Sequence, residues 1–403
     1  MKRLCICVLL AVLPPFYLTA QVVKSEPVSK DTEAQIRKIL LAERLSDFLK
    51  SGNINAGCCY IGNVFHFISV NPTEGVRLRL SGGINLENGI SAYALGAWGT
   101  KDKDLKYMFS GSYRFKVATD VQNTISVLHS DNTYLPFLDG YDHILNSTWR
   151  DKDFFLLRKK TYGISNATKF QLAASNLTIT ASLSRNRNFK YVPDAEKEGF
   201  IPVKANFLYP SLQIKLAEGR NNASEQVIIS RFPLINNSIS LSCGGEFFVW
   251  DADVSNRWRA SLNGKYRLPI NDLRFGCLDF QVEGGYISKD VSRGGLFYPS
   301  SQIGYLSRSY AFLVMPYSQF ANTRFAFVAM AFNSGGLLLN NIKFFRKFHG
   351  NEFLTCKAYF ADYKPYYEIS AGLDNILDLL GFEIAYSSLN QWGAFLRLRI
   401  SDF

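Results

Sequence analysis

Residues 257–268 read RWRASLNGKYRL, and their pattern decides the fold class. One phase of the segment holds Trp258, Ala260, Leu262, Tyr266 and Leu268. The other phase holds only charged or polar residues, namely Arg257, Arg259, Ser261, Asn263, Lys265 and Arg267. A repeat of two residues is the period of a β-strand whose faces meet different surroundings.

The same alternation recurs along most of the chain after about residue 57. Breaks rich in turn-forming residues separate the alternating segments, among them Gly82-Gly83 and Asn236-Asn237. The sequence therefore predicts an all-β protein. The clearest further segments are 75–81, 105–115, 177–184 and 392–401.

The composition excludes a helical membrane protein. The 403 residues are 47% hydrophobic and 20% charged, and the only long apolar run is Leu4 to Leu13. A membrane-spanning helix needs about 20 apolar residues. Two all-β architectures remain. A soluble sandwich buries the apolar strand face against a second sheet, whereas a transmembrane barrel turns it to lipid and encloses the polar face.

Three features favour the barrel. Several segments reach the roughly 9–11 residues with which a strand crosses a membrane. Aromatic residues such as Tyr107, Trp258, Tyr266 and Trp392 lie near the ends of apolar faces, as in interfacial girdles. The chain also ends on Phe403 after an alternating segment, which resembles the assembly signal of bacterial outer-membrane barrels. We predict a transmembrane antiparallel β-barrel of about 16 strands, within about 14–18.

The N-terminal part of the chain predicts export. A short basic head followed by an apolar stretch is the pattern of a secretory signal peptide, which we assign to residues 1–20. Residues 21–56 are predicted to form a periplasmic segment, with an amphipathic helix over residues 30–50. The barrel is assigned to residues 57–403.

Three segments lack the two-residue alternation. Residues 131–152 and 288–305 are predicted to be long loops. Residues 340–348 are predicted to be a short helix or the start of a loop.

If the apolar phase faces lipid, the opposite phase lines the lumen, and it is strongly basic. The predicted lumen-facing basic residues are Arg77, Arg79, Arg114, Arg257, Arg259, Lys265, Arg267, Arg397 and Arg399, with Lys106 and Lys215 in the same phase. The acids assigned to that face are Glu246, Asp279 and Glu283. Such a lumen attracts anions. Alternatively, the arginines pair with acidic loops or a folded-in plug and brace the wall. Glu74 precedes Arg77 and Arg79 in the NPTEG turn, so we expect some internal pairing there.

No motif supports an enzyme. The four histidines are scattered without metal-ligand spacing, and His129-Ser130-Asp131 and Asp142-His143 are the only local catalytic candidates. We therefore expect no catalytic residue, cofactor or metal. The net charge of +11 is compatible with nucleic-acid binding, but export and inward-facing arginines argue against it.

Both ends of the chain resemble a known family. The motifs are the helix IRKILLAERLSDFLKSG within residues 30–52, NPTEGVRLRLSGG at 71–83, GTKDKDLKY at 99–107, and the C-terminal stretches 317–342 and 365–386. Together they resemble a Bacteroidetes outer-membrane family of unknown function, whose longer members carry an N-terminal carboxypeptidase-regulatory-like domain. The resemblance implies an outer-membrane barrel related to BamA-like surface antigens, and no known reaction.

These observations predict an integral, non-enzymatic protein of the bacterial outer membrane. We expect it to act in transport across that membrane or in its assembly, with a basic lumen that favours anionic groups. The expected partners are outer-membrane lipid, the barrel-assembly machinery, and an anionic solute or lipopolysaccharide. The alternative is a secreted soluble β-sandwich that binds glycans or proteins.

Overall fold

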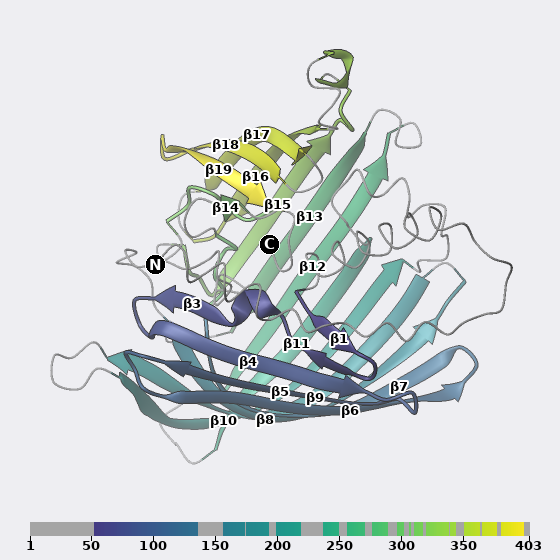
Figure 1. Cartoon of the computed structure of the whole chain (residues 1–403), viewed down its shortest axis with the longest axis vertical. Coiled ribbons are helices and arrows are strands. Elements are labelled where there is room, and N and C mark those ends of the chain that lie inside the picture. The colour runs from purple at the N-terminus through teal and green to yellow at the C-terminus, as the bar shows by residue number, and fades with distance from the viewer. Residues whose placement is uncertain are drawn as a thin grey trace, which may run out of the picture. The chain divides into compact units, whose positions relative to one another are not determined.

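A computed structural model gives the architecture (Figure 1). The structure describes residues 52–135, 156–173, 175–192, 199–218, 237–249, 256–270, 276–288, 296–301, 306–307, 310–316, 320–337, 339–343, 350–362, 365–376 and 380–398. All of them belong to one compact unit, Asp47–Phe403. Within these ranges, no helix has the length and apolar character needed to span a membrane.

The described residues form strands and two short 3-10 helices. The strands at the start of the sheet are β1 (Ile54–Ala56), β2 (Cys59–Ile61), β3 (Ile68–Asn71), β4 (Gly75–Asn85), β5 (Ile90–Gly99), β6 (Leu105–Ala118), β7 (Val121–Tyr134), β8 (Leu157–Gln171), β9 (Ser175–Val192) and β10 (Gly199–Glu218). The later strands are β11 (Ser238–Val249), β12 (Arg257–Pro269), β13 (Cys277–Ile287), β14 (Leu306–Ser307), β15 (Arg324–Asn333), β16 (Asn351–Phe360), β17 (Tyr366–Ile376), β18 (Leu380–Ser387) and β19 (Trp392–Leu398). The 3-10 helices are η1 (Val64–His66) and η5 (Leu339–Asn341).

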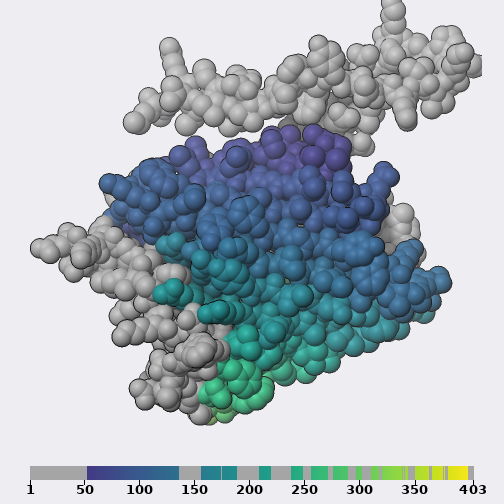
Figure 2. Space-filling model, turned by 90° about the horizontal axis from the view of Figure 1, so that it is seen from below, coloured from purple at the N-terminus to yellow at the C-terminus, as the bar shows by residue number. Residues whose placement is uncertain are grey.

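These strands form one 19-stranded sheet. From β4 to β13, each strand pairs antiparallel with the one before it. β15 then pairs antiparallel with β13, and each strand from β16 to β19 with the one before it. Figure 2 shows this succession on one face, where the purple and blue of the early strands give way to teal and green. The short strands β2 and β3 share the other edge of β4, on either side of η1. Counting that interrupted strand once gives eighteen positions in the described part of the sheet, or sixteen when the short strands β1 and β14 are also left out. The antiparallel pairing agrees with the predicted all-β fold.

The last strand has an additional partner. Residues 306–307 of β14 pair in parallel with Leu396 and Arg397 of β19. Among the described residues, the strand registers pair β19 with β18 and β14 and include no pairing of β19 with β2, β3 or β4. The sheet is therefore curved and continuous, but its first and last strands are not hydrogen-bonded to each other within these ranges.

In this sheet the apolar side chains are exposed and the charged side chains are buried, which is the inverse of the pattern in a water-soluble protein. On β4, Leu78 and Leu80 are exposed, and Leu80 retains 64% of its surface. Arg77 lies between Val76 and Leu78 in the opposite phase and is 0% exposed. The same contrast recurs on β19, where Leu396 is exposed while Arg397 is buried. We call the exposed apolar side the outer face and the opposite side the inner face.

The outer face carries aromatic residues at the predicted positions. Trp258, Tyr266 and Trp392 are all exposed, and Trp392 retains 75% of its surface. Exposed large aromatic and aliphatic groups in water would forfeit about 25 cal/mol per Å² of apolar area. Contact with hydrocarbon removes that cost, which is why such a face belongs in a bilayer.

The two ends of the sheet differ in their connections. Because neighbouring strands are antiparallel, the connections alternate between the ends. The two longest, 135–156 and 288–323, lie at the same end, which we call the loop end. The opposite end, which includes the tight connections after β4, β6 and β8, is called the turn end.

Some predicted boundaries need correction. Residues 131–134, predicted to lie in a loop, continue β7 because they pair with Leu157 to Lys160 of β8. The described part of 288–305 contains no named strand, and η5 forms near the start of 340–348. The predicted signal peptide and the helix at residues 30–50 lie outside the described residues.

Candidate functional site

The predicted basic residues lie in the inner phase of their strands wherever the structure describes them. Arg77, Arg79, Arg114, Arg257, Arg259, Lys265, Arg267 and Arg397 each alternate with outward apolar or aromatic neighbours. Arg399 and Phe403 lie outside the described residues. The inner face also carries more acids than expected, and these bring several of the cations into defined pairs.

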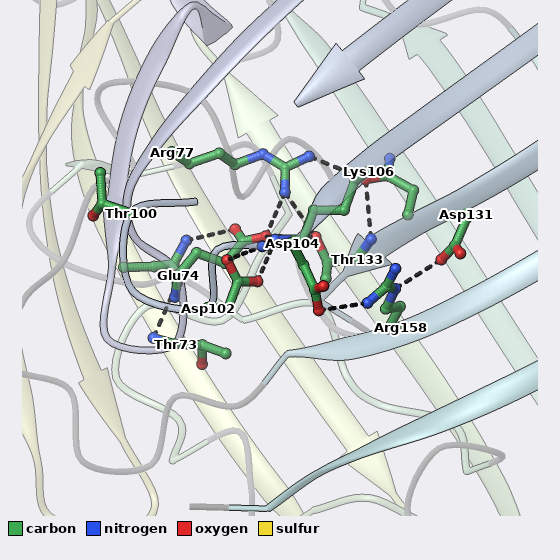
Figure 3. Close-up of polar contacts among 12 residues, drawn as sticks. Thr73, Glu74, Arg77, Thr100, Asp102, Asp104, Lys106, Asp131, Thr133 and Arg158 are labelled. Carbon is green, nitrogen blue, oxygen red and sulfur yellow. Dashed lines mark hydrogen bonds and ion pairs between the residues drawn. The ribbon is translucent and has the colours of Figure 1, made fainter. Parts of the chain in front are cut away.

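The largest of these ion-pair networks lies at the loop end and is drawn in Figure 3. We call Glu74, Arg77, Asp102 and Lys106 the rim cluster. Arg77 Nη1 lies 2.6 Å and Lys106 Nζ 3.0 Å from Glu74 Oε1, and Lys106 also pairs with Asp102. Arg77, Glu74 and Lys106 are all 0% exposed. Two cations and two carboxylates make the cluster neutral, which buried charges require.

Local sequence chemistry positions Glu74 in the turn before β4. The Asn71 side-chain oxygen accepts hydrogen bonds from the backbone N–H groups of Thr73 (3.1 Å) and Glu74 (2.8 Å). The Asn71 amide also donates to Glu74 Oε2 at 2.9 Å. Gly75 follows at φ +73°, and a Cβ there would lie 2.6 Å from Thr100 Oγ1. The segment NPTEG is therefore an Asx-stabilised turn that aims a carboxylate inward.

Burial and charge act oppositely on the two carboxyl groups of the rim cluster. Burial alone would raise the pKa of Glu74, but Arg77 and Lys106 hold that pKa below its ordinary value. For Asp102, burial prevails over the Lys106 cation and raises the pKa. Glu74 therefore remains charged to lower pH than Asp102 does.

The network extends across the loop end to the next strands. Arg77 donates to Thr133 Oγ1 at 2.8 Å and to Asn132 Oδ1 at 3.0 Å. Arg158, at the start of β8, pairs with Asp104 and Asp131, each at 2.7 Å. These bonds connect the turn before β4, the turn before β6 and the ends of β7 and β8, so they fix the loop end of this half of the sheet.

A second feature covers the inner face of β15 to β17. Residues 310–315, which we call the inner segment, belong to the long connection between β13 and β15. Phe312 is buried in edge-on ring contacts with Phe327, Tyr359 and Tyr366, with centroid distances of 5.3, 6.3 and 5.3 Å. These three rings come from three neighbouring strands. The connection therefore folds back over the sheet instead of extending from the loop end.

Glu368 holds the inner segment in place. Its carboxylate accepts the backbone N–H groups of Leu313 (3.0 Å) and Val314 (3.1 Å). It also pairs with Lys357 Nζ at 3.0 Å, and Lys357 donates to the Ala311 carbonyl at 2.6 Å. Glu368 and Lys357 are both almost completely buried. The pair thus neutralises itself while it satisfies the backbone of a segment that forms no strand.

The same connection also contacts the sheet nearer the turn end. Tyr310 donates its hydroxyl hydrogen to Asp279 Oδ2 at 3.1 Å. Arg267 binds that carboxylate through two bonds of 2.6 and 2.7 Å. Nearer the loop end, Arg259 lies over the ring of Phe297, which belongs to the same connection, at 4.1 Å. Two residues of the predicted basic set therefore hold the connection. Arg259 contacts it directly, and Arg267 binds Asp279, the carboxylate that accepts the Tyr310 hydrogen bond.

Arg397 occupies a comparable position on the last strand. Its guanidinium lies 3.1 Å from Glu383 and 3.6 Å from Asp374, and it stacks over Phe353 at 4.1 Å. Since β19 is the last described strand, this contact ties it to β16, β17 and β18.

Asp102, Glu368 and Glu383 are functional residues that the sequence reasoning missed, whereas it expected Glu74 to pair internally with the arginines that follow it, and Arg77 does so. Glu74 and Asp102 lie in turns, where alternation gives no information. Glu368 and Glu383 lie in strands whose alternation is readable, because each falls between outward apolar neighbours in YEIS and FEIA. The inner-face charge is therefore more balanced than the predicted excess of cations.

The catalytic candidate His129-Ser130-Asp131 does not form a catalytic arrangement, because its histidine and serine lie on opposite faces of β7. The described residues contain no group of three or more His, Cys, Asp or Glu side chains arranged to hold a metal. His129 lies on the outer face, stacked on Tyr162 at 4.3 Å, and Ser130 points to the opposite face. Asp142 and His143 lie outside the described residues.

Comparisons with known proteins give a fold-level likeness. No family model matches the chain, so its resemblance to the Bacteroidetes family stays a prediction. No curated protein matches it either. Among solved structures, it is similar to BamA from Haemophilus ducreyi lacking POTRA domains 1–3, with 11% identity and a TM-score of 0.46 over 82% of this chain and 67% of that one. It is also similar to CdiB from Acinetobacter baumannii, with 9% identity and a TM-score of 0.43 over 82% of this chain and 57% of that one.

Proposed function

We propose that this chain is an integral β-barrel protein of the bacterial outer membrane that acts in transport across that membrane or in its assembly. The observation that carries the proposal is the inverted burial of the sheet, with Leu80 and Trp392 exposed while Arg77 and Lys106 are buried. A bilayer solvates the first pair, and an enclosed polar interior accommodates the second. A soluble sandwich would bury the apolar phase instead and is not favoured.

The inner segment favours regulated passage over a permanently open pore. Phe312 packs on the inner face of β15 to β17, Leu313 packs on Ala385 of β18 and Phe395 of β19, and Glu368 accepts the backbone N–H of Leu313. A solute that passes along this part of the inner face has to displace them. The predicted preference for anionic groups then applies to the path that opens when the segment moves, lined in part by Arg257 and Arg259.

The remaining parts of the proposal concern partners. Outer-membrane lipid contacts the outer face, and the barrel-assembly machinery inserts the chain. An anionic solute or lipopolysaccharide is the proposed ligand class, and we propose neither a reaction nor a nucleic-acid partner. Several inner cations, including Arg267 and Arg397, are paired with carboxylates, which does not suit a polyanion-binding surface.

Cell fractionation tests the membrane location on which the proposal depends. We expect the protein to remain in the membrane pellet without detergent, to be extracted by detergent, and to migrate differently on gels before and after heating. Recovery of the folded chain in the aqueous fraction would contradict the membrane assignment and favour the soluble sandwich.

Planar-bilayer recording tests the role of the inner segment. The intact protein should show little steady conductance, and replacement of Phe312 and Leu313 by Ser should produce conducting steps. Anion selectivity of those steps should weaken when Arg257 and Arg259 are replaced by Gln. A large, steady conductance in the intact protein would contradict regulated passage.

A further inference from the structure

Two adjacent cysteines lie in the hairpin formed by β1 and β2. Cys58 belongs to the two-residue connection between the strands, and Cys59 begins β2, where it pairs with Ala56 of β1. Gly57 is the first residue of the connection and has φ +62°, a conformation that glycine adopts without strain. The connection is therefore a tight turn whose shape is set by the local sequence.

This turn brings the two cysteine sulfur atoms together. Successive side chains of a strand point to opposite faces, which would hold neighbouring thiols apart. Cys58 lies in the turn instead, and its Sγ is 3.8 Å from the Sγ of Cys59. The Asn85 backbone N–H donates to the Cys58 carbonyl at 2.7 Å, so the end of β4 also holds the turn.

Both thiols are accessible from outside the chain. Cys58 and Cys59 are exposed, and a Cβ on Gly57 would meet no described atom within 4 Å apart from its neighbours in the chain. The pair lies at the turn end, because β2 pairs with the last residues of β4. Short connections of outer-membrane barrels face the periplasm, so under the proposed function a periplasmic ligand can reach both thiols.

The two cysteines are poorly placed to form a disulfide with each other. The Cα atoms of adjacent residues lie about 3.8 Å apart, whereas those of an ordinary disulfide lie about 4.4–6.8 Å apart. A bond between Cys58 and Cys59 would therefore be strained and easily reduced. Both are free thiols in the structure, and the other described cysteines lie on β11, β13 and β16. The pair is consequently available to bind a ligand.

We propose that Cys58 and Cys59 form a two-coordinate binding site for the soft cation Cu(I). Thiolates select soft cations, and two thiolates suffice to bind Cu(I) in a linear arrangement. Zn(II) takes four ligands in a structural site. The described residues contain no group of three or more His, Cys, Asp or Glu side chains that could hold such an ion. A copper site of this kind departs from the expectation, drawn from the sequence alone, that the chain binds no metal.

Binding exchanges thiol protons for the metal ion. The thiolate is the ligand, so the uptake of one Cu(I) by the pair releases two protons and leaves the site with a single negative charge. Copper enters and remains as Cu(I), and no group is oxidised or reduced. Below the ordinary thiol pKa, the affinity should therefore fall about a hundredfold for each pH unit.

Competition with a coloured chelator tests the site. The folded full chain in detergent would be titrated, without oxygen, against Cu(I) bound to bathocuproine disulfonate, whose absorbance reports the copper that the protein removes. We expect one Cu(I) per chain, with the pH dependence given above. The variants Cys58→Ser and Cys59→Ser should each lose this uptake, because a single thiolate cannot compete with the chelator.

Cys243 provides a matched control, since it is the other exposed cysteine among the described residues. Cys243→Ser also removes one accessible thiol, but it leaves the pair intact, so the uptake of one Cu(I) per chain should be unchanged. Heat-dependent gel migration would verify that each variant is folded.

Three results would overturn the copper site. They are full uptake by the folded Cys58→Ser and Cys59→Ser variants, tighter binding of Zn(II) than of Cu(I), and a disulfide between Cys58 and Cys59 in the protein as isolated from cells. The geometry of the pair does not depend on a membrane. Recovery of the folded chain in the aqueous fraction would therefore contradict the proposed function and leave the result of the copper titration standing.

Discussion

The early and late halves of the sheet share an outer face but differ inside. In β8 to β10 the inner residues include small hydroxyl side chains, and Ser182 and Ser211 approach each other at 2.6 Å between Oγ atoms. In β15 to β17 the inner residues are large or charged, as with Tyr359 and Glu368, and the inner segment covers them. The early strands are also longer, with 18 residues in β9 and 20 in β10 against 10 in β15.

This comparison separates two constraints on the sequence. The outer face meets the same lipid around the sheet, so its apolar alternation is uniform. The inner face meets whatever lies inside, so its residues change where a segment packs against it. The outer phase of the strands therefore identifies a membrane sheet. The inner phase depends on the segments that pack against the inner face.

The largest effect is expected when the contact between Glu368 and the inner segment, which distinguishes the late half, is removed. Glu368→Ala leaves Lys357 and two backbone N–H groups buried without their carboxylate partner. Loss of one partner from a buried ion pair costs about 3–5 kcal/mol. The measurement is the unfolding midpoint, followed by heat-dependent gel migration. As a control, Glu283→Gln should have a much smaller effect, since Glu283 bonds to the neutral amides of Asn263 and Gln281. Equal effects of the two changes would contradict the role given to Glu368.

The next effect tests the property that both halves share. Leu262 is exposed on the outer face, whereas Asn263 lies in the inner phase beside it. Leu262→Arg should cost about 2–4 kcal/mol near the middle of the membrane, and Asn263→Arg should be tolerated. Urea-dependent unfolding in lipid vesicles measures both. Equal tolerance at these neighbours would remove the basis for the outer and inner assignment.

A smaller effect concerns the rim cluster of the early half. Because the pKa of Glu74 is lowered in the folded protein, its contribution to stability is present above its ordinary pKa of 4.5 and is lost as the pH falls through the lower folded value. One such group changes the free energy of unfolding by at most about 1.4 kcal/mol per pH unit. Glu74→Gln should therefore flatten the decline of stability below pH 4.5.

The neighbouring Asp102 contributes a pH dependence of stability with the opposite sign. Its raised pKa means that the folded state takes up its proton more readily than the unfolded state, so the Asp102 contribution rises as the pH falls. Asp102→Asn should consequently steepen the acid decline. Unfolding midpoints measured from pH 6 to pH 3 compare the variants, and identical profiles for all three proteins would contradict the account of the rim cluster.

The smallest effect lies in the hydroxyl pairs of the early half. Ser182→Ala should cost about 0.5–1.5 kcal/mol, the usual contribution of one hydrogen bond. The double variant Ser182→Ala/Ser211→Ala should cost little more, because no hydroxyl then lacks its partner. A double-mutant cycle on unfolding midpoints checks this, and strictly additive losses would show that the pair does not interact.

The sequence predicted the fold through residues whose surroundings are set by the strand period. Leu78, Leu80 and Leu396 lie on the outer face because every second side chain of a strand must face the same way. This local rule holds for β4, β12 and β19 regardless of what those strands pair with. It could not locate the end of β7, where polar residues 131–134 are paired beyond the apolar band.

The inner segment could not be predicted for a physical reason. Residues 311–315 read AFLVM, a short apolar run with no period. Their burial depends on Tyr359, Tyr366 and Glu368, which lie 44 or more residues later in the chain. Position along the sequence carries no information about such contacts. The nearby Glu74 allowed the pairing of Arg77 to be predicted, whereas the pairing of Arg397 was open, because it depends on which carboxylates the fold brings to the inner face.

The most direct test of the central claim is accessibility along β8 in a lipid bilayer. Single cysteines at positions 163–168, placed in a variant without native cysteines, would carry spin labels whose exposure to oxygen and to a water-soluble nickel reagent is compared. We predict that labels at Ile164 and Thr168 favour oxygen, as lipid contact requires, while labels at Ser165 and Ala167 do not. Accessibility without a two-residue period, or with the opposite phase, would contradict the account.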